Sequence, residues 1–267
     1  MITHAILPQW LDDLIYNELN GKYQPCNSDM TVIDWDKPNV LNYLGTYFPR
    51  SYSEAYCIFN NFFDDNKNYF SNKEEISIFD FGSGTGGEII GLLTIIEKSL
   101  PNVKKINVTA FDGNHHALRL YQKVFAKFCE ITNNEMNSNV VPITIDDFYD
   151  LTILDSVLQK KYDIFISFKA ICEFVTKQQF EENNPYEHIV RTFLPKLNDG
   201  GLMFLEDVTS CNMISQEWLP KMMDAGLRNV DCEIIARNDG FNQVYYISHS
   251  RRKNDVSKVA WRMIKNM

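Results

Sequence analysis

The chain has 267 residues, 45% of them hydrophobic and 23% charged, and its formal net charge is −9. This length and composition predict one large globular domain, or one domain with an appended segment. An acidic chain is a poor general binder of nucleic acid, because basic side chains that neutralise phosphates supply most of that affinity. One segment differs, since residues 250–267 carry six basic side chains and one acid, a net charge of +5 that leaves −14 for the rest.

The six cysteines, at positions 26, 57, 129, 172, 211 and 232, have irregular spacings and no C-x-x-C pair. This pattern argues against a zinc site and indicates free thiols in a reducing compartment. The first residues, MITHAILPQWLDD, lack the basic and apolar segments of a signal peptide. No stretch approaches the run of about 18 apolar residues that a membrane span needs. We therefore expect a cytoplasmic protein.

The first 75 residues show helical periodicity and no evident strand. The segment ILPQWLDDLIYNEL has apolar residues at helical spacing. A short aromatic piece, NVLNYLGTYFPR, follows Pro38 and is expected to stop at Pro49. Ser51 or Ser53 is then a suitable N-cap for a second helix. Together these segments predict a helical cap at the N-terminus.

From residue 75 onward, predicted strands and helices alternate. Apolar or alternating runs predict strands at 75–81, 106–112, 140–148, 162–168, 202–208, 230–237 and 243–250. Helical periodicity predicts helices at 86–100, 115–132, 151–160, 186–197 and 216–226. The order predicts a doubly wound α/β fold with a mostly parallel sheet of seven strands. The last two strands have no helix between them, so we expect an antiparallel hairpin at the C-terminal end of the sheet.

Three parts of the chain follow from this pattern: a helical cap over residues 1–75, an α/β domain over 76–250, and a basic amphipathic tail over 251–267. The tail has apolar residues on one helical face, at positions 256, 259, 260, 263, 264 and 267. We expect this face to pack on the body of the protein. Docking of a partner and binding of RNA phosphates are the alternatives.

The motif DFGSGTGG, residues 80–87, ends the strand at 75–81 and opens the next helix. Read as G-x-G-x-x-G, with Gly82, Gly84 and Gly87, it is typical of a dinucleotide-binding loop. Read as acid-x-G-x-G-x-G, from Asp80 to Gly86, it is typical of a loop that binds S-adenosylmethionine. A P-loop is excluded, because no G-K-[ST] follows. The motif alone does not decide between the first two.

An ordered set of motifs over about residues 75–250 resembles the class I S-adenosylmethionine-dependent methyltransferases. After the glycine motif come AFDGN at the end of the second strand, IDDF at the end of the third, and LNDGGLMFLED with the fifth, followed by the hairpin. A dinucleotide-dependent dehydrogenase would have small residues where Glu88 follows the glycines, and a long C-terminal substrate domain. The resemblance implies a Rossmann-like fold and methyltransferase activity with S-adenosylmethionine as the cofactor.

The resemblance also assigns roles to residues around the cofactor. Asp80 would help to hold its ammonium group, and Asp112 would accept both ribose hydroxyls. Asp146 or Asp147 would accept the adenine amine, because the family's usual G-D-F is D-D-F here; Asp147 is the better match, with Phe148 as its backbone partner. Asp112 could instead cap the next helix, and Asp146 could be a helix cap or a solvated acid. The cofactor-binding residues implied are Asp80, Gly82, Ser83, Gly84, Gly86, Asp112, Gly113, Asn114, Asp146, Asp147, Phe148 and Ser167.

Acceptor chemistry is expected beyond the carboxyl ends of the strands. Members that methylate the amines of DNA bases or glutamine carry [DN]-P-P-[YF] after the fourth strand, where this chain has SFKA, residues 167–170. That chemistry is disfavoured. The candidate catalytic residues are Lys169, Glu173 and Glu206, with Asp207 and His249 also at this edge.

The aromatic segment of the cap offers residues for an acceptor pocket or lid, namely Tyr47, Arg50 and Tyr52, with Tyr43 nearby. Arg50 and Tyr52 are expected in a turn bounded by Pro49, whereas Tyr56 is expected to pack in the core. His115 and His116 are adjacent in sequence and so point to different helix faces, which argues against a metal site.

Three functions remain open. The acidic body and aromatic cap favour a methyltransferase that acts on a small molecule or a peptide. The helical leader and the basic tail leave an RNA- or ribosome-associated methyltransferase as the alternative. A non-catalytic subunit that binds S-adenosylmethionine and serves a partner is the second alternative.

Overall fold

The computed structural model describes residues 1–25, 37–158, 161–211, 216–240 and 244–267. Its strands are β1 (His4–Ile6), β2 (Glu75–Phe81), β3 (Lys105–Asp112), β4 (Glu135–Pro142), β5 (Tyr162–Phe168), β6 (Leu197–Val208), β7 (Cys232–Asn238), β8 (Tyr245–His249), β9 (Arg252–Ser257) and β10 (Val259–Asn266). Its α-helices are α1 (Gln9–Asp13), α2 (Lys37–Asp65), α3 (Gly87–Ser99), α4 (His115–Cys129), α5 (Ile171–Phe174), α6 (Lys177–Glu182), α7 (Pro185–Phe193) and α8 (Leu219–Leu227). Shorter π or 3-10 turns cover Leu14–Glu18, Thr152–Ser156 and Leu194–Lys196.

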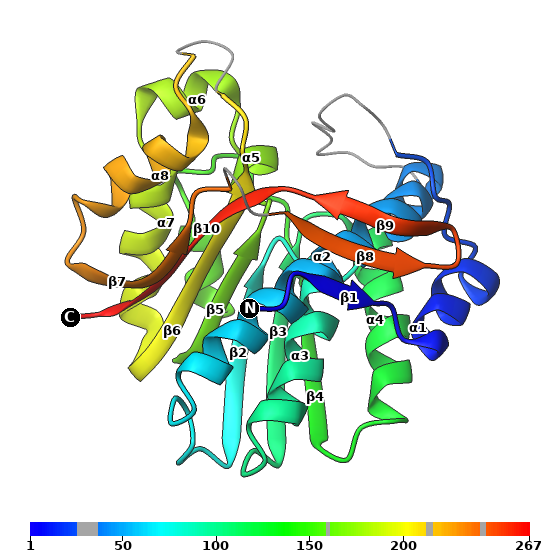
Figure 1. Cartoon of the computed structure of the whole chain (residues 1–267). Helices are drawn as coiled ribbons and strands as arrows, with labels where there is room; N and C mark the ends of the chain where they lie inside the picture. Colours follow the sequence, from blue (N-terminus) through cyan, green and yellow to red (C-terminus); the bar gives the residue numbers. More distant parts are fainter. Residues whose placement is uncertain (26–36, 159–160, 212–215, 241–243) are drawn as a thin grey trace.

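Seven strands form one sheet in the order β4-β3-β2-β5-β6-β10-β7 (Figure 1). Strands β2 to β6 pair in parallel, and β10 lies antiparallel between β6 and β7. This arrangement confirms the predicted α/β fold, with a mostly parallel seven-stranded sheet and an antiparallel strand at its C-terminal end. The carboxyl ends of β2, β3, β5 and β6 therefore meet at one edge of the sheet.

Successive residues of the central strands point to opposite faces of the sheet, and both faces are buried. Ile78 and Ile164 belong to the core under α2, α3 and α4, whereas Phe79 and Phe165 belong to the core under α7 and α8. Continuous apolar runs in β2 and β5 follow from this double burial.

The C-terminal segment is not an amphipathic helix. Residues 252–257 form β9 and residues 259–266 form β10, which pairs with β6 from Val259 to Ile264. Arg262 is fully buried and donates hydrogen bonds to Asp224 and Asp239. Helical and strand spacing are hard to separate in a short apolar segment. The predicted boundary after residue 250 therefore falls inside the fold.

The predicted partner of β7 is also wrong, because β8 belongs to a second, three-stranded sheet with the order β1-β8-β9. Strand β1 pairs in parallel with β8, in a region where no strand was expected. In the third strand, the predicted range 140–148 shifts to β4, residues 135–142. This strand lies at the sheet edge and is largely exposed, so its residues are polar and give no apolar signal.

Helix α2 runs without interruption through Pro49, where the sequence predicted a break. A proline inside a helix leaves the carbonyl four residues earlier without its usual donor. Here that carbonyl belongs to Gly45, and the Tyr16 hydroxyl donates a hydrogen bond to it at 2.7 Å. The tertiary contact supplies the missing donor.

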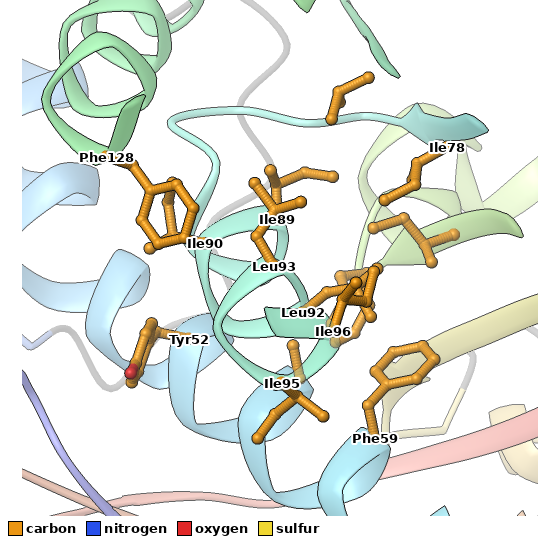
Figure 2. Packing of buried hydrophobic residues seen from close by; sticks show 14 of the residues in the cluster. Tyr52, Phe59, Ile78, Ile89, Ile90, Leu92, Leu93, Ile95, Ile96 and Phe128 are labelled. Atoms are coloured by element: carbon orange, nitrogen blue, oxygen red, sulfur yellow. The ribbon is translucent and has the colours of Figure 1, made fainter. Parts of the chain in front are cut away.

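The same helix packs along α3 in a close, apolar contact (Figure 2). Tyr52 and Phe59 of α2 lie beside Ile95 and its neighbours in α3. A side chain at Gly91 would collide with the Tyr52 carbonyl oxygen, so glycine permits the close approach of the two helices. The N-terminal segment is thus built into the core over α3.

None of the described helices is long and apolar enough to cross a membrane. The described cysteines, which exclude Cys26, are free thiols.

Candidate functional site

The glycine motif forms the turn between β2 and α3. Gly84 and Gly86 have positive φ angles of 46° and 85°, which favour glycine. Gly87 is instead the first residue of α3, and a side chain there would collide with the Phe48 carbonyl of α2. The acid-x-G-x-G-x-G register therefore describes the turn, and Gly87 serves helix packing.

The end of β3 holds this turn in place. The Asp112 carboxylate accepts a hydrogen bond from the Gly84 N–H at 2.8 Å and another from the Asn114 N–H at 2.7 Å. Burial raises the pKa of Asp112 to about 6, against the lowering effect of these two donors. The cap of α4 is Asn114, whose side chain accepts from two backbone N–H groups. Asp112 is thus not the helix cap and is tied to the glycine turn.

Asp80 lies at the end of β2 with no solvent exposure, and neither carboxylate oxygen accepts from an N–H or hydroxyl donor among the described residues. Its hydrogen-bond neighbour is the Glu88 carboxyl. Burial raises the pKa of Asp80 well above the usual range, and the Glu88 and Asp112 carboxylates add to the effect. Burial likewise raises the pKa of Glu88, in the first turn of α3, to about 8. The site therefore contains acids whose ionised forms need a positive partner.

Lys169 follows β5 in a left-handed conformation, with φ 54°. Its Nζ lies 2.6 Å from Glu54 Oε2 of α2. The Ser257 hydroxyl of β9 donates to the other Glu54 oxygen. Burial alone would lower the pKa of Lys169, but Glu54 and Glu206 raise it above its ordinary value. The ion pair joins α2 to the carboxyl ends of the strands.

Three further predicted acids lie at this edge with different surroundings. Glu206 is 1% exposed, its carboxyl is in hydrogen-bond contact with Glu54, and no N–H or hydroxyl donor in the described part of the chain reaches it. Burial raises the pKa of Glu173 to about 8, with a contribution from Asp112. Asp207 accepts hydrogen bonds from the Tyr186 hydroxyl and the Val208 N–H, which give it a structural role.

The loop after β4 lies next to Gly113, since a side chain there would contact Thr144 at 3.5 Å. Asp146 and Asp147 are both exposed in this loop, and Asp147 accepts a hydrogen bond from the Tyr149 N–H. Phe148 is buried in the core. The choice between the two acids for adenine stays a prediction.

Two further residues predicted to bind the cofactor are buried, Ser83 in the glycine turn and Ser167 in β5. The Ser83 hydroxyl donates to the Phe111 carbonyl at 3.3 Å, and its N–H donates to the same oxygen. Gly82 also donates its N–H to this carbonyl. Ser167 is fully buried in β5.

The aromatic segment of α2 divides into two groups. Tyr43 lies over the turn, with its ring 3.3 Å from where a side chain at Gly84 would begin. Tyr47 stacks on Tyr43 with ring centroids 5.3 Å apart, and the Arg50 guanidinium lies 5.5 Å from the Tyr47 ring. Tyr52 is 1% exposed and stacks on Tyr56. Tyr52 belongs to the core, and its role in a lid stays a prediction. Tyr56 packs against the same core, as expected.

Arg50 and His249 belong to a separate cluster on the small sheet. Arg50 is helical rather than in a turn, and its guanidinium makes two hydrogen bonds to Asp255 of β9. His249 and the Arg50 guanidinium together outweigh the effect of burial and lower the pKa of Asp255. His249 hydrogen-bonds with the Tyr16 hydroxyl at 3.0 Å and stacks on its ring.

Sequence reasoning missed Glu54 and Glu88 as members of the site. Glu88 follows the glycines directly. Its burial could have been predicted, because it lies on the same face of α3 as apolar residues. Glu54 comes from the same helix as the aromatic residues, but no local pattern indicates that it meets Lys169, which is 115 positions later.

No protein-family model and no curated protein matches the chain. Among solved structures, it is similar to magnesium protoporphyrin IX methyltransferase of Synechocystis PCC 6803, solved with S-adenosylmethionine, at 10% identity and a TM-score of 0.48 over 96% of this chain and 90% of that one. It is also similar to an S-adenosylmethionine-dependent methyltransferase of Methanosarcina mazei, at 13% identity and a TM-score of 0.45 over 76% and 97% of the two chains. A third is the [4+2]-cyclase SpnF, at 12% identity and a TM-score of 0.47 over 78% and 81%.

Proposed function

We propose that this protein is an S-adenosylmethionine-dependent methyltransferase whose acceptor is a small molecule or a peptide. The observation that carries the proposal is the Asp80 carboxyl, fully buried beside the glycine turn, where its hydrogen-bond neighbour is the acid Glu88 and no cation or N–H donor reaches it among the described residues. A buried carboxylate of this kind is costly unless it meets a cation or a donor. The ammonium group of the cofactor is such a partner.

The residues around the turn fit the rest of the cofactor. Gly82, Gly84 and Gly86 have positive φ angles, and a side chain at each would press on Ala170, Tyr43 or Tyr121 in turn, so only glycine permits this tight turn. The Asp112 carboxylate stands at the end of β3, where an ionised acid accepts hydrogen bonds from ribose hydroxyls. When bound, S-adenosylmethionine supplies a methyl group on a positively charged sulfur. The residues of the chain would bind the cofactor and the acceptor and orient them for the transfer. The acids of the site favour a positively charged ligand.

An RNA acceptor has weaker support than the sequence alone suggested. Of the basic residues near the C-terminus, Arg262 is buried against Asp224, and Lys265 forms an ion pair with Glu233. Exposed cations remain at Arg251, Arg252, Lys253 and Lys258. This patch is small beside a net charge of −9 for the whole chain.

A labelling experiment tests the proposal and separates the acceptor classes. The protein is incubated with S-adenosylmethionine tritiated in the methyl group and cell extract, with and without prior RNase treatment. The proposal expects labelled product that survives RNase. Loss of all label after RNase would support the RNA alternative, and cofactor binding without any transfer would support the non-catalytic subunit.

A further inference from the structure

A second buried acid that lacks a cationic or N–H donor lies at the same edge of the sheet, apart from Asp80. Glu206 lies near the end of β6, is 1% exposed, and receives no hydrogen bond from an N–H or hydroxyl donor in the described part of the chain. Its carboxyl is in hydrogen-bond contact with the Glu54 carboxyl, whose two oxygens also accept from Lys169 and Ser257. Two carboxyls therefore meet one lysine, and one of them has to hold a proton unless a further cation binds.

The charge around Glu206 explains what kind of ligand suits it. Burial raises its pKa, the Glu54 carboxylate raises it further, and Lys169 offsets only part of this. Glu88 also faces the group and adds negative charge. An anionic ligand such as a carboxylate or a phosphate would meet three acids and one lysine here. A positively charged N–H donor would provide the charge and the hydrogen bonds that Glu206 lacks.

We propose that Glu206, flanked by Glu54 and Lys169, forms a subsite that binds a basic alkyl amine of the acceptor in its ammonium form. The inference deepens the proposed function and rests on it, because it names the chemical class of the acceptor. An alkyl amine differs from the neutral, planar amines of DNA bases and glutamine, which the SFKA segment at residues 167–170 disfavours. A free small-molecule amine and the amine of a peptide share this chemistry.

Binding of a simple probe tests the subsite without any reaction. The probe is n-butylammonium, with n-butanol and butyrate as neutral and anionic matches of similar size. Its binding is measured by calorimetry and by the rise in Tm, with and without saturating S-adenosylhomocysteine. The variants are Glu206→Gln, which keeps the shape, and Glu206→Asp, which keeps the charge. The control is Glu130→Gln, since Glu130 is exposed and pairs only with Lys127 among the described residues.

We expect butylammonium to bind wild type and Glu130→Gln alike, and Glu206→Gln to bind it about tenfold or more weakly, as expected for a lost charge-assisted hydrogen bond. Glu206→Asp should keep the preference for butylammonium over butanol. Equal binding by wild type and Glu206→Gln, or preference for butyrate, would overturn the subsite. Failure of S-adenosylhomocysteine to bind, beside butylammonium binding that depends on Glu206, would reject the methyltransferase and leave the subsite standing.

A second arm identifies the source of the amine. Products labelled with the tritiated methyl group in extract are separated by ultrafiltration and passed over a cation exchanger. The subsite predicts labelled product that the exchanger holds, in the filtrate for a small molecule or in the fraction kept by the ultrafilter for a peptide or protein. Labelled product without a basic amine, or label carried by RNA, would contradict the proposal.

Discussion

Replacing Asp80 by asparagine should change stability and cofactor affinity in opposite directions. Asparagine has the shape of the aspartate but carries no charge. In the free protein, Asp80 is buried beside the Glu88 carboxyl with no cation or N–H donor among the described residues, and its pKa is raised, so ionisation destabilises the fold. The stability that protonated Asp80 contributes is fully present below the pKa of an unfolded aspartate and is lost as pH rises toward and through the folded-state pKa. The variant avoids this loss.

The size of the effect follows from proton linkage. The stability of Asp80→Asn relative to wild type should grow by up to about 1.4 kcal/mol per pH unit above pH ~4, until the folded-state pKa is reached. Asp80 and Glu88 share the titration, so this slope belongs to the pair. Affinity for S-adenosylmethionine should fall by about 1.5–3 kcal/mol, the usual value of a hydrogen bond to a charged group. Urea denaturation at several pH values and calorimetry at pH 7 measure the two effects.

A matched control exists on the neighbouring strand. Asp163, at the start of β5, is 4% exposed but accepts hydrogen bonds from Lys73, Ser77 and Asn198. These partners outweigh burial and lower its pKa. Its ionised form therefore adds stability above the pKa of an unfolded aspartate, and this is lost as pH falls through the folded-state pKa. Asp163→Asn should destabilise at neutral pH and leave affinity unchanged. If Asp80→Asn behaves like Asp163→Asn, the functional reading of Asp80 is wrong.

Three further outcomes are expected. Gly84→Val should abolish binding of S-adenosylmethionine in calorimetry, because valine is strained at φ 46° and would fill the space along the turn; a folded variant with normal affinity would reject the loop assignment. Asp112→Ala should weaken binding of S-adenosylmethionine by about 1.5–3 kcal/mol. It should also lower the Tm of the free protein, because the Asp112 carboxylate accepts hydrogen bonds from the Gly84 and Asn114 N–H groups. Unchanged affinity would show that Asp112 only holds the turn and does not bind the cofactor. Deletion of residues 253–267 should unfold the protein, as circular dichroism would show, because it removes β10 from between β6 and β7; a folded, soluble product would contradict the sheet order.

Local patterns in the sequence predicted the parallel strands well. Double burial gives β2 and β5 continuous apolar runs, and the glycine turn between β2 and α3 has its own signature. Prediction failed where tertiary contacts decide the outcome. Helix α2 continues through Pro49 because Tyr16, 29 positions before Gly45, supplies the missing donor. The edge strand β4 and the central strand β10 were misplaced, because polar edge residues and a short mixed segment carry weak periodicity.

The candidate site also has one part that local sequence patterns predicted and another that only tertiary contacts create. Asp80, Asp112 and the glycines lie at the ends of strands that the pattern located, so the sequence could bring them together. Glu54 of α2 reaches Lys169 across 115 positions of the chain, and Ser257 of β9 reaches Glu54 across 203. Only the packing of α2 on the sheet and the position of β9 create these contacts. The burial of Tyr52 against α3 has the same origin, since it depends on how α2 packs.

The most direct test of the central claim is isothermal calorimetry of the purified protein with S-adenosylmethionine and, separately, with NADH. The account predicts binding of S-adenosylmethionine in the low-micromolar range, about −8 kcal/mol, and no heat with NADH. Affinity for S-adenosylmethionine should also rise with pH, since its binding favours the ionised form of Asp80 and releases a proton. Heat with NADH and none with S-adenosylmethionine would contradict the account and restore the dinucleotide interpretation of the glycine turn.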